Sequence, residues 1–247
     1  NKQEEFMSKY HPLANLAPRD IVSRAIYQTM LDTGHPCVYL DITNKSSEWI
    51  KTRFPSIYEN AMDRGFDMTK SPLPVVPAAH YCCGGVGVNL DGRTSVKRLY
   101  AVGEVACTGV HGANRLASTS LLEALVWGYY AGKDAAKTCE GEDYFPEIFP
   151  WIVENEMIDL ALISQDWLTL KNTMWNYVGL IRSRQRLQRA RTILRHLQTE
   201  IEDFYDQSKM SKEVIGLRNA VQTSIAIITA SLESRESCGS HFMIDEN

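Results

Sequence analysis

Hydrophobic positions recur every third or fourth residue over the carboxyl-terminal part of the chain, where glycine is rare. This spacing is typical of amphipathic helices. It predicts helices over residues 152–170, 172–189, 190–206 and 211–233, which together would form a helical bundle. The clearest apolar stripe consists of Ala190, Ile193, Leu194, Leu197, Ile201 and Phe204.

The pattern before residue 139 is different, because short helical and extended segments alternate there. Helices are predicted from Arg19 to about Gly34, over 46–54 and over 55–64, and strands over 37–42, 86–90 and 99–102. Prolines at positions 72, 74 and 77 mark a domain boundary. We therefore predict an α+β fold with domains at 1–79, 80–138 and 139–247.

The stretch from residue 80 to residue 127 contains the strongest candidate site. A helix is predicted to begin at Ser120, because Ser120 and Glu123 have the spacing of a capping box. This helix is apolar nearly all round, so we expect it to be buried. The first amides of a helix attract electron-rich groups. Ser120 and Leu121 are therefore candidate ligand-binding residues.

The segments before this helix contain further candidate ligand-binding residues. Gly84 and Gly85 allow close approach of the backbone to a ligand. Glu104 follows a predicted strand, at the sheet edge where ligand groups are held. Asn114 and Arg115 lie in the polar loop just before the helix. Together with the helix start, these residues predict a binding site for an electron-rich ligand.

Arg19 breaks a local rule, because a cation in the first turn of a helix opposes the helix dipole. Such violations are expected at functional sites, although a surface arginine offset by Asp20 is the alternative. His80 alone is more typical of a structural histidine. His111 either orders its loop or lines the site.

The composition narrows the function classes. The net charge is −4 and the sequence pI is about 5.9, which argues against a nucleic-acid partner. No apolar run has the length of a membrane span. The six cysteines have no metal-ligand spacing, so we predict reduced thiols inside a cell and no metal site. An arginine-rich run over 182–195 is interpreted as a solvated helix face.

Three blocks resemble the succinate dehydrogenase and fumarate reductase flavoprotein family, and within it the branch of the L-aspartate oxidases. They read PAAHYCCGG at 77–85, LYAVGEVACTG at 99–109 and HGANRLASTSLLEALV at 111–126. The segments at 10–26 and 175–183 also fit. The resemblance implies the end of a capping domain, the carboxyl-terminal part of a Rossmann-like FAD-binding domain and a carboxyl-terminal helical bundle.

The resemblance also implies roles for the candidate residues. Arg19 would be the catalytic acid/base residue, and His80 and Arg115 would bind the substrate carboxylates. The cofactor FAD would contact a set of residues that comprises Gly84, Gly85, Glu104, Asn114, Ser120 and Leu121. The helix that begins at Ser120 would stabilise negative charge on the reduced flavin.

The implied activity is the flavin-dependent oxidation of L-aspartate to iminoaspartate, with oxygen or fumarate as electron acceptor. In the family this is the first step of de novo NAD biosynthesis, and quinolinate synthase is the expected partner. The dinucleotide-binding glycine fingerprint does not occur in this sequence. The resemblance therefore implies a carboxyl-terminal half that needs an amino-terminal half to hold FAD, either in the same protein or as a separate chain. The expected location is the cytoplasm or, in a plant, a plastid.

Two alternatives stay open at this point. The first is a succinate dehydrogenase or fumarate reductase type of flavoprotein, although the sequence at 117–120 with Glu123 fits an aspartate oxidase better. The second is a truncated, non-catalytic relative that acts as an interaction module. The segment at 233–241 resembles a tail motif of the family with an interruption at 236–238, which puts the docking of this tail in doubt.

Overall fold

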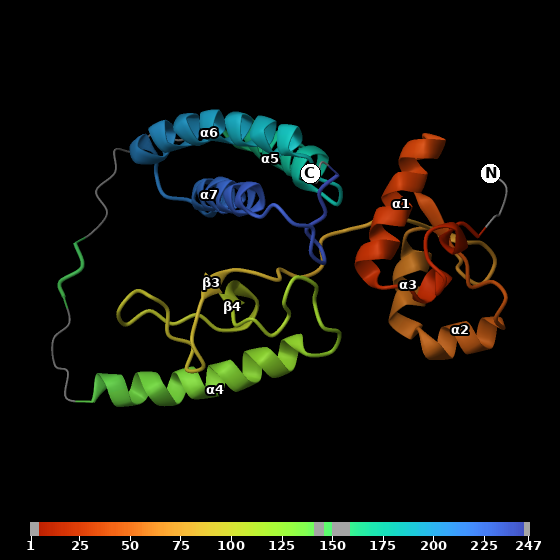
Figure 1. The fold of residues 1–247 in the computed structure, drawn as a ribbon, viewed down its shortest axis with the longest axis horizontal. Coiled ribbons are helices and arrows are strands. Elements are labelled where there is room, and N and C mark those ends of the chain that lie inside the picture. The colour runs from red at the N-terminus through yellow and green to blue at the C-terminus, as the bar shows by residue number, and fades with distance from the viewer. Residues whose placement is uncertain (1–4, 141–145, 150–158, 245–247) are drawn as a thin grey trace. The chain divides into compact units, whose positions relative to one another are not determined.

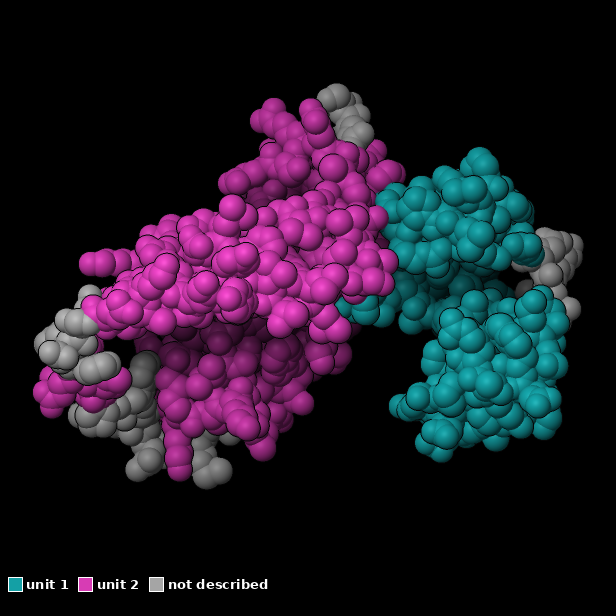
Figure 2. All heavy atoms as spheres, turned by 90° about the horizontal axis from the view of Figure 1, so that it is seen from below, with its two compact units in different colours: residues 1–80 teal, residues 81–247 magenta. Residues whose placement is uncertain are grey.

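A computed structural model describes residues 5–140, 146–149 and 159–244. The chain divides into two compact units, Asn1–His80 and Tyr81–Asn247 (Figure 2). The described residues form helices together with two small sheets of two strands each. The predicted mixture of helix and sheet is confirmed at this level.

The first unit is built from short elements whose ends follow from local sequence. Its helices are α1 (Arg19–Thr33), α2 (Ser47–Arg53) and α3 (Pro55–Asp63), and its antiparallel strands are β1 (Val38–Leu40) and β2 (Leu73–Val75). Gly34 ends α1 with a left-handed φ of 67°. Ser46 caps α2, because its side chain accepts a hydrogen bond from the amide of Trp49. The boundaries of the three helices and of β1 match the sequence predictions to within a few residues, whereas β2 was not predicted.

The second unit begins with a glycine-rich segment and a long helix (Figure 1). Strands β3 (Val86–Gly87) and β4 (Ala106–Cys107) pair in parallel, and α4 extends over Ser120–Cys139. The strand predicted over 99–102 is wrong. Tyr100 forms a single bridge with Arg93, because the chain between them closes a tight turn.

Three long helices form the bundle: α5 (Leu160–Val178), α6 (Arg184–Gln207) and α7 (Lys212–Glu233) (Figure 1). The sequence predicted a break between a helix over 172–189 and a helix over 190–206, and the position of this break is wrong. The break lies between α5 and α6, where Ser183 caps α6 by accepting a hydrogen bond from the amide of Arg186. The beginning of the helix predicted from residue 152 falls outside the described residues.

The apolar stripe predicted for the bundle is confirmed. Ala190, Leu194 and Ile201 of this stripe are at most 1% exposed and pack in one core with residues of α5 and α7. Each fully buried leucine or isoleucine contributes about 1.5–3 kcal/mol of transfer free energy. Arg182 departs from the predicted solvated face. It is held by the carbonyls of Val178 and Gly179 at 3.0 and 3.2 Å.

Helix α4 is far more exposed than the sequence predicts. Leu121, Leu122 and Leu125 are 85%, 60% and 69% exposed, whereas Glu123 is only 5% exposed. The prediction that this helix is buried is therefore wrong for the chain as described. No helix among the described residues is long and apolar enough to cross a membrane.

Candidate functional site

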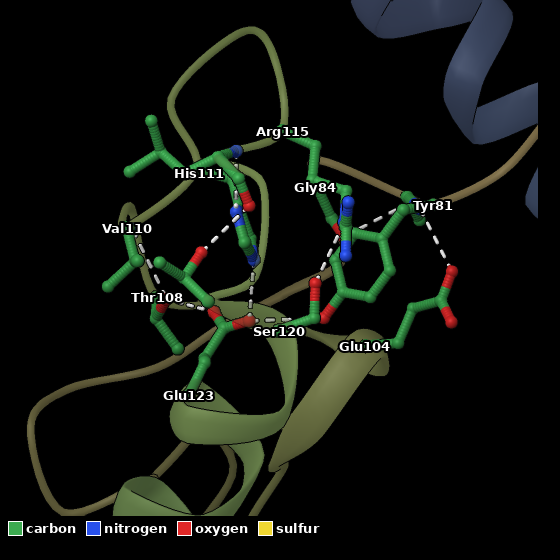
Figure 3. Close-up of polar contacts among 12 residues, drawn as sticks. Tyr81, Gly84, Glu104, Thr108, Val110, His111, Arg115, Ser120 and Glu123 are labelled. Carbon is green, nitrogen blue, oxygen red and sulfur yellow. Dashed lines mark hydrogen bonds and ion pairs between the residues drawn. The ribbon is translucent and has the colours of Figure 1, made fainter. Parts of the chain in front are cut away.

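The glycine-rich segment and the residues around β4 are held together by a hydrogen bond to a side chain and by a close approach of their backbones. The amide of Cys82 donates a hydrogen bond of 3.0 Å to Glu104 Oε1 (Figure 3). Gly85 has a φ of 146°, and a Cβ atom there would lie 2.2 Å from the carbonyl oxygen of Val105. Gly85 is therefore required by the approach of one backbone segment to another. The cofactor contacts predicted for Gly84 and Gly85 stay predictions.

The start of α4 differs from the predicted capping box. The N-cap residue is Thr119, whose side chain makes no cap hydrogen bond and donates to the carbonyl of Leu116 at 2.9 Å. Ser120 Oγ accepts a hydrogen bond of 2.9 Å from Nε of Arg115. The capping-box prediction is wrong, because tertiary partners take up both side chains of the motif, Ser120 and Glu123.

Glu123 is the centre of a buried polar network (Figure 3). Its Oε2 accepts hydrogen bonds from the Tyr81 hydroxyl at 3.1 Å and from His111 Nε2 at 2.9 Å. Its Oε1 accepts a short hydrogen bond from the Thr108 hydroxyl. One carboxylate thus joins the glycine-rich segment, the strand end and the polar loop. His111, only 7% exposed, orders its loop.

The protonation states in this network follow from the donors. The amide of Leu116 donates to Nδ1 of His111 at 3.2 Å, so the ring proton lies on Nε2 and points to Glu123. Burial acts to raise the pKa of Glu123, but its hydrogen bonds outweigh burial and leave the pKa below its usual range. Burial raises the pKa of Tyr81. A carboxylate at Glu123 and a neutral phenol at Tyr81 therefore coexist near neutral pH.

Arg115 lies at the edge of this network. Its guanidinium carbon is 5.4 Å from the ring centroid of Tyr81, a cation–π contact. Its Nε donates to Ser120 at the start of α4. Two neighbours thus set the plane of the guanidinium, and the terminal nitrogens of arginine form the edge that binds a carboxylate in a bidentate way.

The carboxyl-terminal tail docks on the loop that carries Arg115. The amide of Ser240 donates to the carbonyl of Ala113 at 2.9 Å. His241 Nδ1 accepts from Arg182 Nη1 at 2.9 Å, so the tail also contacts the bundle. The doubt about docking is therefore resolved in favour of a docked tail.

Arg19 and His80 lie in the first unit, whereas Arg115 lies in the second. Arg19 Nη2 donates to the carbonyls of Asn15 and Ala17 at 2.7 and 2.9 Å, and these acceptors offset its unfavourable place at a helix start. His80 is exposed. The convergence of these two residues with Arg115 stays a prediction, as do their roles.

The sequence did not predict that Tyr81 and Thr108 donate hydrogen bonds to Glu123, and it assigned Glu123 to the helix cap. One signal was available. Glu123 is the only charged residue between Leu121 and Trp127. A lone carboxylate in a helix start that is otherwise apolar indicates buried hydrogen-bond donors, but it does not say which donors these are.

The residues at the start of α4 fit the flavin cofactor. The first amides of a helix are donors at its positive end, and here the Thr119 side chain does not cap them. Glu104 is exposed, and its carboxylate can accept more hydrogen bonds than the one from the Cys82 amide. It could therefore also accept hydrogen bonds from the hydroxyl groups of a ribityl chain. This donor and acceptor set suits an electron-rich ring with a polyol side chain.

Comparisons with known proteins agree with this geometry. Residues 1–121 match the family model described as FAD binding domain, and residues 167–247 match the one described as Fumarate reductase flavoprotein C-term. These two matches define the class, an FAD-binding flavoprotein. The chain belongs to the succinate dehydrogenase and fumarate reductase flavoprotein family.

Several similar curated proteins carry the name L-aspartate oxidase. The chain is 45% identical to L-aspartate oxidase of Pseudomonas aeruginosa, over 98% of this chain and 45% of that protein. It is 39% identical to the chloroplastic L-aspartate oxidase of Oryza sativa subsp. japonica, over 98% of this chain and 40% of that protein. The chain therefore spans less than half the length of these relatives.

Solved structures share the fold. A quinol-fumarate reductase with menaquinol molecules matches with a TM-score of 0.82 and 26% identity, over 99% of this chain and 48% of that chain. The Mycobacterium smegmatis Sdh1 complex in the apo form matches with a TM-score of 0.71 and 29% identity, over 93% of this chain and 42% of that chain.

Proposed function

We propose that this chain takes part in the flavin-dependent oxidation of L-aspartate to iminoaspartate. The observation that carries the proposal is the similarity to L-aspartate oxidases over 98% of this chain. The position of Arg115 beside an uncapped helix start supports it. The relatives are more than twice as long as the matched segment, so we infer that tight FAD binding also needs residues equivalent to their amino-terminal part.

Substrate binding is assigned to Arg115 and His80. L-Aspartate carries two carboxylates, and each needs fixed donors before a hydride can leave its α-carbon. A guanidinium held in plane by Tyr81 and Ser120 is suited to one carboxylate. The imidazole of His80, next to Tyr81 in sequence, is proposed to take part in holding the other.

Proton transfer is assigned to Arg19. Its guanidinium already donates to two backbone carbonyls, which fixes the head group near the start of α1. In the proposed reaction Arg19 passes a proton in concert with water, because its protonated guanidinium must release one N–H proton to water as it receives one from the substrate. FAD, when bound, supplies the acceptor for the hydride. The amides at the start of α4 stabilise negative charge there, and Glu104 and Asn114 help to hold the cofactor.

The test uses the purified native assembly that contains this chain. We expect a visible flavin spectrum and the formation of iminoaspartate, measured as oxaloacetate and ammonia after hydrolysis, when L-aspartate is added. The variant Arg19→Leu should retain the flavin spectrum and lose at least about a hundredfold in turnover. A colourless assembly, or near-normal turnover by Arg19→Leu, contradicts the proposal.

Succinate oxidation or fumarate reduction is the second candidate, because the solved structures that match are fumarate reductase and succinate dehydrogenase flavoproteins. The names of the more similar relatives favour L-aspartate. One assay separates the two activities: release of ammonia from L-aspartate supports the oxidase, whereas dye reduction with succinate in place of L-aspartate supports the dehydrogenase.

A further inference from the structure

We propose that Glu123 is the positioning residue for Arg115: its buried carboxylate fixes the aromatic ring and the loop backbone that determine where the guanidinium lies. The inference rests on the proposed function, in which Arg115 binds a substrate carboxylate. Glu123 does not itself contact Arg115 in the described structure. It acts through two routes that begin at different donors (Figure 3).

The first route passes through Tyr81. The Tyr81 hydroxyl donates to Glu123 at 3.1 Å, and the face of the same ring lies 5.4 Å from the guanidinium of Arg115. The ring also contacts the imidazole of His111 edge to face, with centroids 5.0 Å apart. Holding the hydroxyl therefore holds the surface on which the guanidinium rests.

The second route passes through His111. Glu123 accepts a hydrogen bond from the Nε2–H group of His111, which leaves Nδ1 as the acceptor for the amide of Leu116. Leu116 directly follows Arg115, so this hydrogen bond fixes the backbone on the carboxyl side of the arginine. Without the carboxylate, the imidazole could take the other tautomer, and the Leu116 amide would lose its acceptor.

An amide cannot replace the carboxylate without loss. Glu123 faces three donors, namely the hydroxyls of Thr108 and Tyr81 and the imidazole of His111. A carboxylate is purely an acceptor, whereas glutamine would turn two N–H groups toward some of these donors. The charge itself is accommodated by the location of Glu123 in the first turn of α4.

The first experiment uses Glu123→Gln in the native flavin-containing assembly. The dissociation constant for succinate is measured from the change in flavin absorbance, and the KM for L-aspartate is measured from initial rates. We expect both to rise about ten- to a hundredfold, the loss for a hydrogen-bonded charged group, while flavin content and turnover at saturation change little. The matched control is Asp134→Asn, which removes a carboxylate from the same helix and should leave both constants unchanged.

The second experiment tests whether Glu123 acts through Arg115. In an Arg115→Lys background, Glu123→Gln should add little further loss of dicarboxylate affinity, because the group that it positions is already gone. Losses that multiply fully across the two variants overturn the inference. Tyr81→Phe, which keeps the ring and removes one donor, should show a smaller loss of the same kind even if Glu123→Gln folds poorly.

Failure of the inference and failure of the proposed function give different results. A wild-type assembly that binds flavin but neither dicarboxylate contradicts the proposed function. The exchange rate of the Arg115 Nε proton, followed by NMR, then tests the positioning itself, and Glu123→Gln should accelerate it. Unchanged exchange together with unchanged affinity overturns the role of Glu123.

Discussion

At the residue scale, Gly85 shows how a glycine can be required by its own chain. Its φ of 146° and the 2.2 Å that would separate a Cβ from the Val105 carbonyl leave no room for a side chain. Both effects act in the folded state, so a substitution must distort either the glycine-rich segment or β4.

Gly85→Ala is therefore expected to destabilise the second unit by at least about 2 kcal/mol, measured by urea denaturation followed by tryptophan fluorescence. Gly87→Ala is the control, because a Cβ atom at Gly87 would meet no atom of the described residues within 4 Å. It should change the free energy of unfolding by less than about 1 kcal/mol. Equal effects of the two substitutions would contradict this account of the backbone.

At the element scale, α4 is tied to the turn that precedes β4. Trp127 Nε1 donates to the carbonyl of Asn89 at 3.1 Å, and Asp134 accepts from Arg93 Nη2 and from the Tyr100 hydroxyl, each at 2.7 Å. The two α4 side chains are seven residues apart and share a face of the helix. The turn is thereby fixed along two helical turns of α4.

The carboxyl of Asp134 gives this contact a pH dependence. The hydrogen bonds from Arg93 and Tyr100 hold its pKa at about 2, below the value of 3.8 for a free side chain. The folded state therefore binds the proton less well, and the contribution of Asp134 to stability is present above about pH 4 and is lost as the pH falls toward 2.

Thermal unfolding between pH 5 and about pH 2 measures this contribution. The melting temperature of the wild type should fall more steeply than that of Asp134→Asn below about pH 4, so that the two curves converge in acid. A constant difference between the two curves down to the lowest pH would contradict the lowered pKa of Asp134.

Helix ends that are fixed by local signals in the sequence were predicted correctly, whereas the break between α5 and α6 was not. Gly34, Ser46 and Ser183 act at helix ends through local backbone geometry, and α1, α2 and α3 were predicted to within a few residues. The break between α5 and α6 was misplaced, because the apolar period continues through it. An unbroken period does not reveal where a cap interrupts the helix.

The site was harder to predict than the elements, because its contacts join residues that are distant in sequence. The motif of Ser120 and Glu123 satisfied the rule for a capping box. However, Glu123 is held by Tyr81, 42 positions away, and by Thr108, 15 positions away. Pattern reasoning identified the loop and the helix start, but not the tertiary donors that decide which role a polar side chain takes.

At the scale of the second unit, Arg182 links the bundle to the tail. Its guanidinium donates to the end of α5, to Ser231 of α7 and to His241 of the tail, at distances between 2.9 and 3.2 Å. Burial lowers the pKa of Arg182. None of these acceptors is a carboxylate, so the tail is part of what keeps this buried cation hydrogen-bonded.

The other end of the tail is set by Gly239, which has a φ of 57° and lies against Ala113. A Cβ atom there would be 2.4 Å from the Ala113 carbonyl, the acceptor for the Ser240 amide. Gly239→Ala should therefore release the tail from the loop that carries Arg115, at a cost of about 1–3 kcal/mol. Ser240→Ala is the control, because it keeps the backbone amide that makes the contact.

Hydrogen–deuterium exchange of the native assembly distinguishes the two variants. In Gly239→Ala, amide exchange should accelerate both in the tail around 238–244 and in the loop at 111–116, whereas Ser240→Ala should leave both segments near the wild-type rate. Faster exchange in the tail alone would mean that the loop keeps its position without the tail. In that case Glu123 and its donors would be sufficient to order the loop, and the contact with Ala113 would serve only to hold the tail.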